Sequence, residues 1–205
     1  MKRALAAIAA SAVAALTMIG VAPLAHADPV GCEPVATFGI GGTGSPDSAE
    51  FGPGVRKIHY TATFFPLSAN FYDRVVLEGS TKMVNAVNAY AAQCPGRIVV
   101  KGYSLGARAA GDALEVLGNG PYANRISGVL YADPKRPGGI EDALEGFDMF
   151  GLKMTGPRHG FNVPVRSECN PRDGICDFPF PHNIPATVDN IAGYLTGAHA
   201  YNVNN

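Results

Sequence analysis

Charged residues are scarce in this 205-residue chain: they make up 16% of it, and 16 basic against 17 acidic side chains leave a net charge of −1. A chain so close to neutral lacks the basic surface that binds nucleic acid, so we expect no nucleic-acid partner. The four cysteines include no C-x-x-C pair and the histidines have no paired spacing, so we expect no metal site. Internal repeats, low-complexity tracts and long charged linkers are also missing, which argues against a second domain.

Long apolar runs are missing too, except at the N-terminus. There, segment 4–21 follows two basic residues and precedes Ala-His-Ala at 25–27, the small-x-small pattern of a signal-peptidase site. We therefore predict a signal peptide over 1–27 and a secreted or cell-envelope protein. Its mature part, 28–205, is expected to be one globular domain, a monomer, and without a membrane span. An uncleaved membrane anchor is the alternative.

All four cysteines, Cys32, Cys94, Cys169 and Cys176, lie in the mature part. An even number in an exported chain favours disulfides, and three pairings are possible. Cys169 and Cys176 bracket a turn-rich loop, 170–175, that a bridge could staple, which leaves Cys32 to pair with Cys94. We predict these two disulfides. On the chain-entropy model the longer loop contributes about 4 kcal/mol and the shorter one about 2 to 3 kcal/mol.

Apolar runs of strand length alternate with helix-like stretches along the mature chain. The runs predict strands over 35–40, 55–63, 97–101 and 126–132. The periodic stretches predict helices over 78–92, 107–117 and 184–195. This alternation is typical of an α/β fold, in which a parallel sheet is covered by helices on both faces. Between 138 and 160 the pattern weakens, and a substrate-facing cap or a peripheral helix and loop fits equally well.

The most informative segment is 102–106, Gly-Tyr-Ser-Leu-Gly, which lies between a predicted strand and a predicted helix. In this context the G-x-S-x-G pattern places a serine in a tight turn above the sheet, with small neighbours that allow close packing. Ser104 is therefore the candidate nucleophile. Because a serine hydroxyl is a weak nucleophile at neutral pH, a histidine base, an acid and an oxyanion site must come from elsewhere in the chain.

The glycine-rich loop 39–44 formally matches the dinucleotide-binding pattern G-x-G-x-x-G. It lacks the helix that must follow, because prolines and glycines interrupt the next residues, and it lacks the acidic residue about twenty positions on. In a G-x-S-x-G hydrolase, a loop after an early strand supplies one oxyanion donor, and the residue after the nucleophile supplies the other. We predict Thr43 and Leu105 for these roles. An ordinary glycine turn is the alternative.

The mature chain has four histidines, and order along the chain narrows the choice of base. In α/β-hydrolases the nucleophile, the acid and the histidine follow one another in that order. His59 precedes Ser104 and His159 precedes the best acid, so both are expected to be structural or surface groups. His182, in a proline-rich loop, and His199, after the last predicted helix, remain.

Asp173 is the preferred acid because the predicted short disulfide would fix its loop, and a triad acid must hold the imidazole's orientation and tautomer. Asp133 is the runner-up, because it follows a clear strand. The other candidates are Asp112, Asp177 and Asp189.

Together these segments resemble the cutinase-like serine esterases and, in particular, the related PE-PPE hydrolase domain of mycobacteria and their relatives. The matching pieces are a cysteine before the first strand, Ala-Gln-Cys-Pro at 92–95, Gly-Tyr-Ser-Leu-Gly-Ala at 102–107 and Cys-Asn-Pro-Arg-Asp-Gly-Ile-Cys at 169–176. Cutinases usually carry glutamine where this chain has Leu105. The backbone amide is kept, so the departure bears on efficiency more than on reaction type.

The resemblance implies an α/β-hydrolase fold of three layers with a small central parallel sheet. It also implies ester substrates with acyl chains and no metal or organic cofactor. In PE-PPE domains the histidine follows the last helix, which implies His199 as the base. In cutinases proper it lies closer to the disulfide loop, which keeps His182 as the alternative.

The expected function is that of a secreted serine esterase: His199 takes the proton of Ser104, which attacks the ester carbonyl, and Asp173 orients the base. Water or a bound alcohol could resolve the acyl-enzyme, so an acyltransferase is one alternative. A catalytically inactive cell-envelope binding module is the other. Five apolar side chains suit either an acyl-chain site or plain core: Phe64, Phe65, Phe147, Met149 and Phe150.

Overall fold

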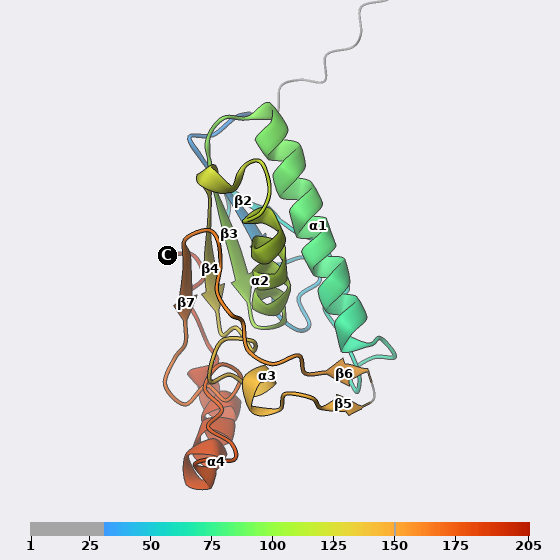
Figure 1. Ribbon diagram of the computed structural model, residues 1–205, viewed down its shortest axis with the longest axis vertical. Coiled ribbons are helices and arrows are strands. Elements are labelled where there is room, and N and C mark those ends of the chain that lie inside the picture. Colours follow the sequence, from blue (N-terminus) through green and yellow to red (C-terminus); the bar gives the residue numbers. More distant parts are fainter. Residues whose placement is uncertain (1–30, 150) are drawn as a thin grey trace, which may run out of the picture.

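Five parallel strands form the central sheet of the protein, in the order β2-β1-β3-β4-β7 (Figure 1). The computed structural model describes residues 31–149 and 151–205, so the predicted signal peptide 1–27 and Phe150 lie outside the described residues. The strands are β1 Val35–Ile40, β2 Val55–Lys57, β3 Arg97–Tyr103, β4 Ile126–Tyr131 and β7 Val165–Glu168. The prediction of an α/β fold with a central parallel sheet is confirmed.

The strand predicted over 55–63 is present only in part. β2 ends at Lys57, and the following residues turn toward the loop after β1, where the Gly44 N–H donates to the Ala62 carbonyl at 2.7 Å. The prediction was wrong over 58–63 because the backbone groups of this segment are satisfied in part by a loop.

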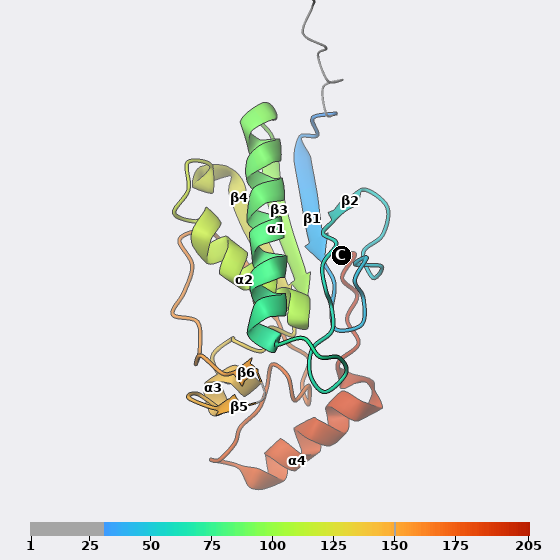
Figure 2. The ribbon, with the colours of Figure 1, turned by 90° about the vertical axis from the view of Figure 1, so that its right-hand side faces the viewer.

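Two long helices, α1 Tyr72–Gln93 and α2 Leu105–Leu117, lie side by side on one face of the sheet (Figure 2). α1 begins before the predicted residue 78, because Val75 and Val76 extend its buried face toward the N-terminus. The main core lies between these helices and the sheet. Its side chains from the strands, which include Ile98 and Val100, are fully buried.

The other face of the sheet carries loops and the C-terminal segment. The Lys101 ammonium donates to the carbonyl oxygens of Val203, at 3.0 Å, and Asn205, at 2.7 Å. Val203 also packs with Phe51 and Tyr131 in a second, smaller apolar cluster. The C-terminal segment is thereby fixed to β3, the strand that leads to Ser104.

The segment between β4 and β7 forms a short helix and a hairpin beside the start of α1. These elements are α3 Ile140–Ala143, β5 Asp148–Met149 and β6 Leu152–Lys153. The Tyr72 N–H donates to the Gly151 carbonyl at 2.9 Å, which joins the hairpin to α1. A single turn of 3-10 helix, η1 Ala123–Arg125, precedes β4.

The last helix, α4 Ile184–Gly193, lies at the end of the molecule toward which the strands point, and it continues into the π-helical turn η2 Tyr194–Ala198 (Figure 1). Asn183 caps α4, because its side-chain oxygen accepts the Ala186 N–H at 3.1 Å. Within the described residues, no helix is long and apolar enough to cross a membrane.

Both predicted disulfides are present. Cys32 and Cys94 join the segment before β1 to the end of α1, across 62 residues. Cys169 and Cys176 close the short loop after β7, across 7 residues.

Candidate active site

Ser104 lies in the sharp turn between β3 and α2, with a left-handed φ of 55° and ψ of −121°. The two glycines of its pattern are required by close packing. A Cβ at Gly102 would lie 2.5 Å from the Gly106 carbonyl oxygen, and a Cβ at Gly106 would lie 2.3 Å from the carbonyl oxygens of Ile40 and Gly41. Only glycine lets the turn approach both the helix and the neighbouring loop, and this packing holds the serine at the edge of the sheet.

His199 connects Ser104 to Asp173. Its Nε2 lies 2.9 Å from Ser104 Oγ, and its Nδ1 lies 2.8 Å from Asp173 Oδ2. Because an aspartate only accepts, this arrangement assigns the proton of the neutral ring to Nδ1 and leaves Nε2 free to accept from the serine hydroxyl. The structure thus brings together the three residues predicted for the triad. His182 is exposed, and among the described residues it forms no hydrogen bond with any of the three.

Asp173 is fully buried, and the surrounding loop fixes its carboxylate. Its Oδ1 accepts the Ile175 N–H at 3.1 Å, and its Oδ2 accepts the Tyr201 hydroxyl at 2.7 Å. Tyr201 in turn accepts the Asn170 N–H at 2.7 Å. Burial and the neighbouring carboxylate keep the pKa of Tyr201 above its usual value, so the hydroxyl remains a donor.

Sequence reasoning missed Tyr201. The one signal for it is an aromatic residue two positions after the candidate histidine, which by itself predicts no contact with an aspartate that precedes it by 28 residues.

The backbone of His199 is held by β3. The Tyr103 hydroxyl donates to the His199 carbonyl at 2.7 Å, and the Tyr103 ring lies 5.1 Å from the imidazole, measured between ring centres. Burial, together with the carboxylates of Asp173 and Glu50, raises the pKa of Tyr103 to about 12. Tyr103, the last residue of β3, therefore positions the candidate base, and the candidate nucleophile follows it directly in the chain.

The glycine-rich loop after β1 runs beside Ser104. A Cβ on Gly42 would lie 3.3 Å from the Ser104 Cβ. The Glu50 carboxylate holds this loop, because it accepts the Gly42 N–H at 3.0 Å and the Ser45 hydroxyl at 2.6 Å. Glu50 was not identified from the sequence, since nothing local connects it to the turn.

The two predicted oxyanion donors are Thr43, in the loop after β1, and Leu105, directly after Ser104. Thr43 follows Gly42 in the loop and is exposed, and no hydrogen bond of its amide to a described residue is found. Leu105 is the first residue of α2, where a backbone N–H has no partner within the helix.

Asp133, the runner-up acid, does not reach the triad. Its Oδ2 accepts the Arg158 Nε–H at 2.9 Å, and both side chains are buried. The other aspartates on helices are also engaged: Asp112 accepts from Arg158, and Asp189 pairs with Arg172 on the surface.

The aromatic side chains predicted for an acyl-chain site differ in their surroundings. Phe64 packs against the main core and meets the Tyr72 ring edge to face at 5.0 Å. Phe65, Phe147 and Met149 are 40%, 39% and 50% exposed, so they are surface groups.

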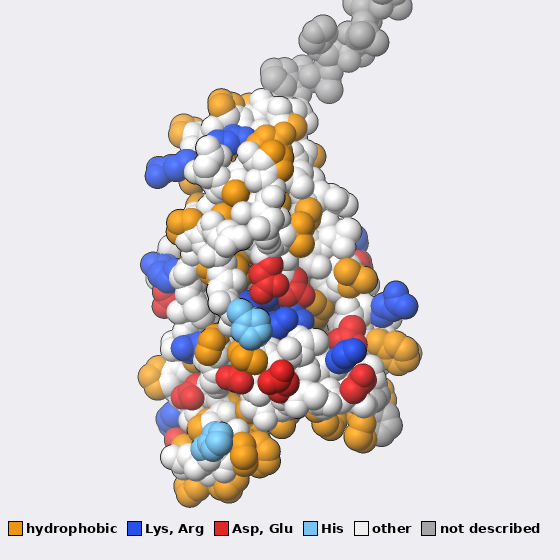
Figure 3. Space-filling model, in the orientation of Figure 1, with side chains coloured by type: hydrophobic (Ala, Val, Ile, Leu, Met, Phe, Trp, Pro, Cys, Tyr) orange, Lys and Arg blue, Asp and Glu red, His pale blue; other side chains and the backbone are white. Residues whose placement is uncertain are grey.

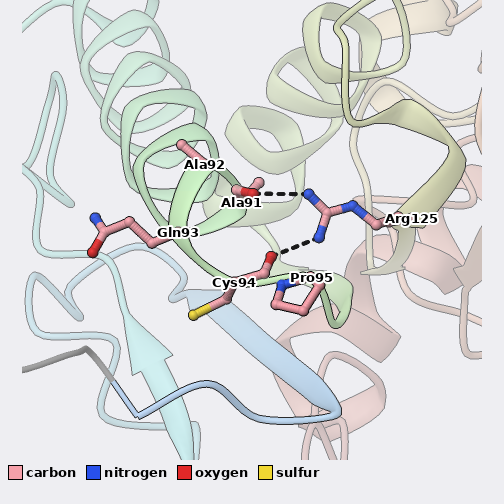
Figure 4. Close-up of a pocket in the computed structure, with 6 residues that line it drawn as sticks. All are labelled: Ala91, Ala92, Gln93, Cys94, Pro95 and Arg125. Carbon is pink, nitrogen blue, oxygen red and sulfur yellow. Dashed lines mark hydrogen bonds between the residues drawn. The ribbon is translucent and has the colours of Figure 1, made fainter.

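A hollow lies at the opposite end of the sheet, and the residues that line it are joined by hydrogen bonds (Figure 4). Arg125 projects into it and donates to the carbonyl oxygens of Ala91, at 2.8 Å, and Cys94, at 2.6 Å. Its guanidinium therefore satisfies the last carbonyls of α1.

A parallel sheet with a serine in a strand-turn-helix elbow and a histidine after the last helix is the architecture of an α/β-hydrolase. The sequence model of the cutinase family matches residues 42–204, and the chain belongs to this family of ester hydrolases. No curated protein matches the chain significantly.

Several solved structures share the fold, among them the following two. A cutinase-like protein from Cryptococcus sp. is 20% identical and has a TM-score of 0.51; the match covers 83% of this chain and 94% of that one. An acetyl xylan esterase is 21% identical, also with a TM-score of 0.51, and the match covers 82% of this chain and 100% of that one.

Proposed function

We propose that this protein is a secreted serine esterase that hydrolyses carboxylic esters through an acyl-enzyme on Ser104. The observation that carries the proposal is the pair of hydrogen bonds made by His199, to Ser104 Oγ at 2.9 Å and to Asp173 Oδ2 at 2.8 Å. Membership of an ester-hydrolysing family supports it.

In the first half of the reaction, Ser104 Oγ attacks the ester carbonyl while His199 Nε2 takes its proton. Asp173, buried beside Nδ1, stabilises the imidazolium that forms. The amides of Thr43 and Leu105 stabilise the oxyanion. The tetrahedral intermediate then collapses, the C–O bond to the alcohol breaks, and His199 returns the proton to the departing alkoxide.

In the second half, His199 takes a proton from a water molecule, which attacks the acyl carbonyl. The bond between the acyl carbon and Ser104 Oγ then breaks, His199 returns the proton to Oγ, and the carboxylic acid leaves. An alcohol in place of water would give acyl transfer with the same residues, as the sequence also allowed. His199 is 14% exposed in its side chain, so solvent reaches the base. This access is what hydrolysis requires.

The oxyanion donors are supported without the glutamine usual in cutinases. Leu105 offers its backbone amide, and the Glu50 carboxylate holds the facing loop through Gly42 and Ser45. Removing one preorganised oxyanion donor from a serine hydrolase costs about 3 to 4 kcal/mol of transition-state stabilisation.

Secretion is supported by the pattern of residues 1–27 and by the two disulfides, which persist in oxidising compartments. The rival function, a cell-envelope binding module without chemistry, has no comparable observation in its favour. It would not require a complete hydrogen-bonded relay from a buried aspartate to a serine.

Labelling with a fluorophosphonate probe tests the proposal. The disulfide-intact protein lacking residues 1–27 should label, and Ser104→Ala and His199→Ala should not. His182→Ala is the matched control and should label normally. Wild-type protein that is folded by circular dichroism but fails to label would favour the binding module, and loss of labelling in His182→Ala would reassign the base.

A further inference from the structure

Helix α4 is amphipathic in the reverse sense of most surface helices. Its buried residues are Thr187, Asn190 and Gly193, which are polar or small. Its large apolar side chains recur with helical spacing on the solvent side: Ile184 is 50% exposed, Val188 61%, Ile191 43% and, in the following turn, Leu195 74%. A surface helix normally turns its apolar stripe toward the core, so this face is a candidate for contact with something outside the chain.

The orientation of α4 is fixed by its polar face. The Asn190 side chain donates to the Asp177 carbonyl at 2.8 Å, and the Asn190 carbonyl accepts the Gly174 N–H at 3.1 Å. A Cβ on Gly193 would lie 2.2 Å from the Arg172 carbonyl oxygen, so the helix is packed directly on the disulfide loop. A rotation of α4 that turned its apolar side chains inward would break these contacts and would offer the disulfide loop no equivalent polar partner.

This apolar face leads directly to the candidate active site. The turn that follows α4 ends at His199, and the Tyr194 ring lies 4.7 Å from the imidazole between ring centres. In the space-filling view, apolar side chains gather over α4 at the end of the molecule toward which the strands point (Figure 3).

The loop before α1 and the adjoining hairpin lie toward the same end of the molecule (Figure 2), and they carry a second group of exposed apolar side chains. In this group Leu67 is 70% exposed, Phe71 57% and Met149 50%. Two groups of exposed apolar side chains therefore lie toward the end of the molecule that carries Ser104.

We propose that the outward face of α4 docks on a lipid surface without net charge and so brings ester groups to Ser104. This inference rests on the proposed esterase function. The charge of α4 selects the occupant: the helix has no lysine or arginine, and Asp189, its one charged residue, is paired with Arg172 at 2.7 Å. A helix that binds an anionic lipid surface does so in part through basic side chains, whereas binding to a zwitterionic or neutral surface depends on the buried apolar area alone.

Vesicle flotation tests the docking surface. We use the disulfide-intact Ser104→Ala protein, so that no hydrolysis alters the vesicles, with phosphatidylcholine vesicles at low and high salt. Val188→Ser combined with Leu195→Ser should weaken partitioning by at least about tenfold, because two aliphatic side chains no longer enter the lipid. Val116→Ser is the matched control: Val116 is 59% exposed on α2, away from this end, and should bind like the parent.

Several results would overturn the proposal. The proposal fails if the Ser104→Ala parent does not bind the vesicles, or if the Val116→Ser control loses as much binding as the Val188 and Leu195 variant. It also fails if binding requires anionic phosphatidylglycerol. A parent that sediments as a dimer, and becomes monomeric in the Val188 and Leu195 variant, would assign the face to a second copy of the chain. Fluorophosphonate labelling of the protein that keeps Ser104, Val188 and Leu195 separates the proposals. If this protein labels and its Ser104→Ala form does not bind vesicles, the docking surface alone is refuted; if the Ser104→Ala form binds vesicles and the protein with Ser104 does not label, the esterase alone is refuted.

Discussion

Asp173 and Asp133 are both almost fully buried, and both follow strands of the central sheet, yet their partners differ in kind. Asp133 is bound by the guanidinium of Arg158, a permanent cation. Asp173 is bound by the imidazole of His199, which can gain and lose a proton, and by the neutral hydroxyl of Tyr201. The two carboxylates have similar burial and therefore similar desolvation costs.

The difference shows that the partner, more than burial, decides what a buried carboxylate can do. Burial raises the pKa of Asp133, and Arg158 opposes this by stabilising the charge. Arg158 also binds Asp112 and Glu115, so the cluster ties α2 to the segment before β7. The Arg158 cluster thus holds the fold together, whereas the role proposed for Asp173 is to orient His199 and to stabilise its imidazolium.

The largest expected effect is on turnover when Asp173 becomes neutral. Asp173→Asn should lower kcat for p-nitrophenyl butyrate by about 10³- to 10⁴-fold, because the amide can no longer hold the required tautomer or stabilise the imidazolium. Asp177→Asn, an exposed acid in the same region, is the control and should turn over normally. Near-normal kcat in Asp173→Asn would show that Asp173, like Asp133, has only a structural role.

Arg158→Met should act on stability and leave the chemistry intact. Removing one partner leaves the Asp133 carboxylate buried without its cation, so the free energy of unfolding in urea should fall by about 3 to 5 kcal/mol. Arg172→Met, which breaks the exposed pair with Asp189, should cost about 1 kcal/mol or less. If kcat per folded molecule fell more than severalfold in Arg158→Met, the Arg158 cluster would also contribute to catalysis, and the contrast between the two aspartates would fail.

The two disulfides sharpen the same contrast. Replacing Cys32 and Cys94 by serine should cost about 4 kcal/mol of stability with little change in kcat at temperatures where the protein is folded. Replacing Cys169 and Cys176 should cost about 2 to 3 kcal/mol and should also lower kcat, because the loop that carries Asp173 is released. Equal effects of both pairs on kcat would refute a positioning role for the short bridge.

The smallest effect is expected from Tyr201→Phe, which removes one hydrogen bond to Asp173. Turnover should fall about tenfold, the equivalent of a hydrogen bond to a charged group of about 1.5 kcal/mol. Tyr131→Phe is a matched control, since the Tyr131 hydroxyl contacts the Asn205 carbonyl, at 3.5 Å, and the Arg166 side chain, and neither partner belongs to the proposed triad. Unchanged kcat in Tyr201→Phe would show that the backbone bond from Ile175 suffices to hold the carboxylate.

Local patterns predicted the parts of the molecule that depend on neighbouring residues. The elbow at Ser104 follows from a strand, two glycines and a helix in immediate succession, and the short disulfide follows from a turn between nearby cysteines. The start of α1 was placed too late, since Tyr72, Val75 and Val76 already form the buried side of its first turns.

Contacts between distant segments were beyond reach from the sequence. Tyr201 and Glu50 gain their roles only when the chain folds back on the sheet. The choice between His199 and His182 rested on resemblance, because residue spacing cannot show which loop returns to the serine. The strand predicted over 58–63 was wrong for the same reason, as its backbone partners lie in the loop after β1.

The hydrogen bond between His199 and Ser104 joins residues that are 95 positions apart. Contacts of such long sequence separation carry a large loop-closure cost and do not form while the chain is only locally structured. Regain of esterase activity after dilution from denaturant would therefore report the arrival of the C-terminal segment on β3, an event that circular dichroism of the helices does not detect. The time course of regained activity would then measure the rate at which folding is completed.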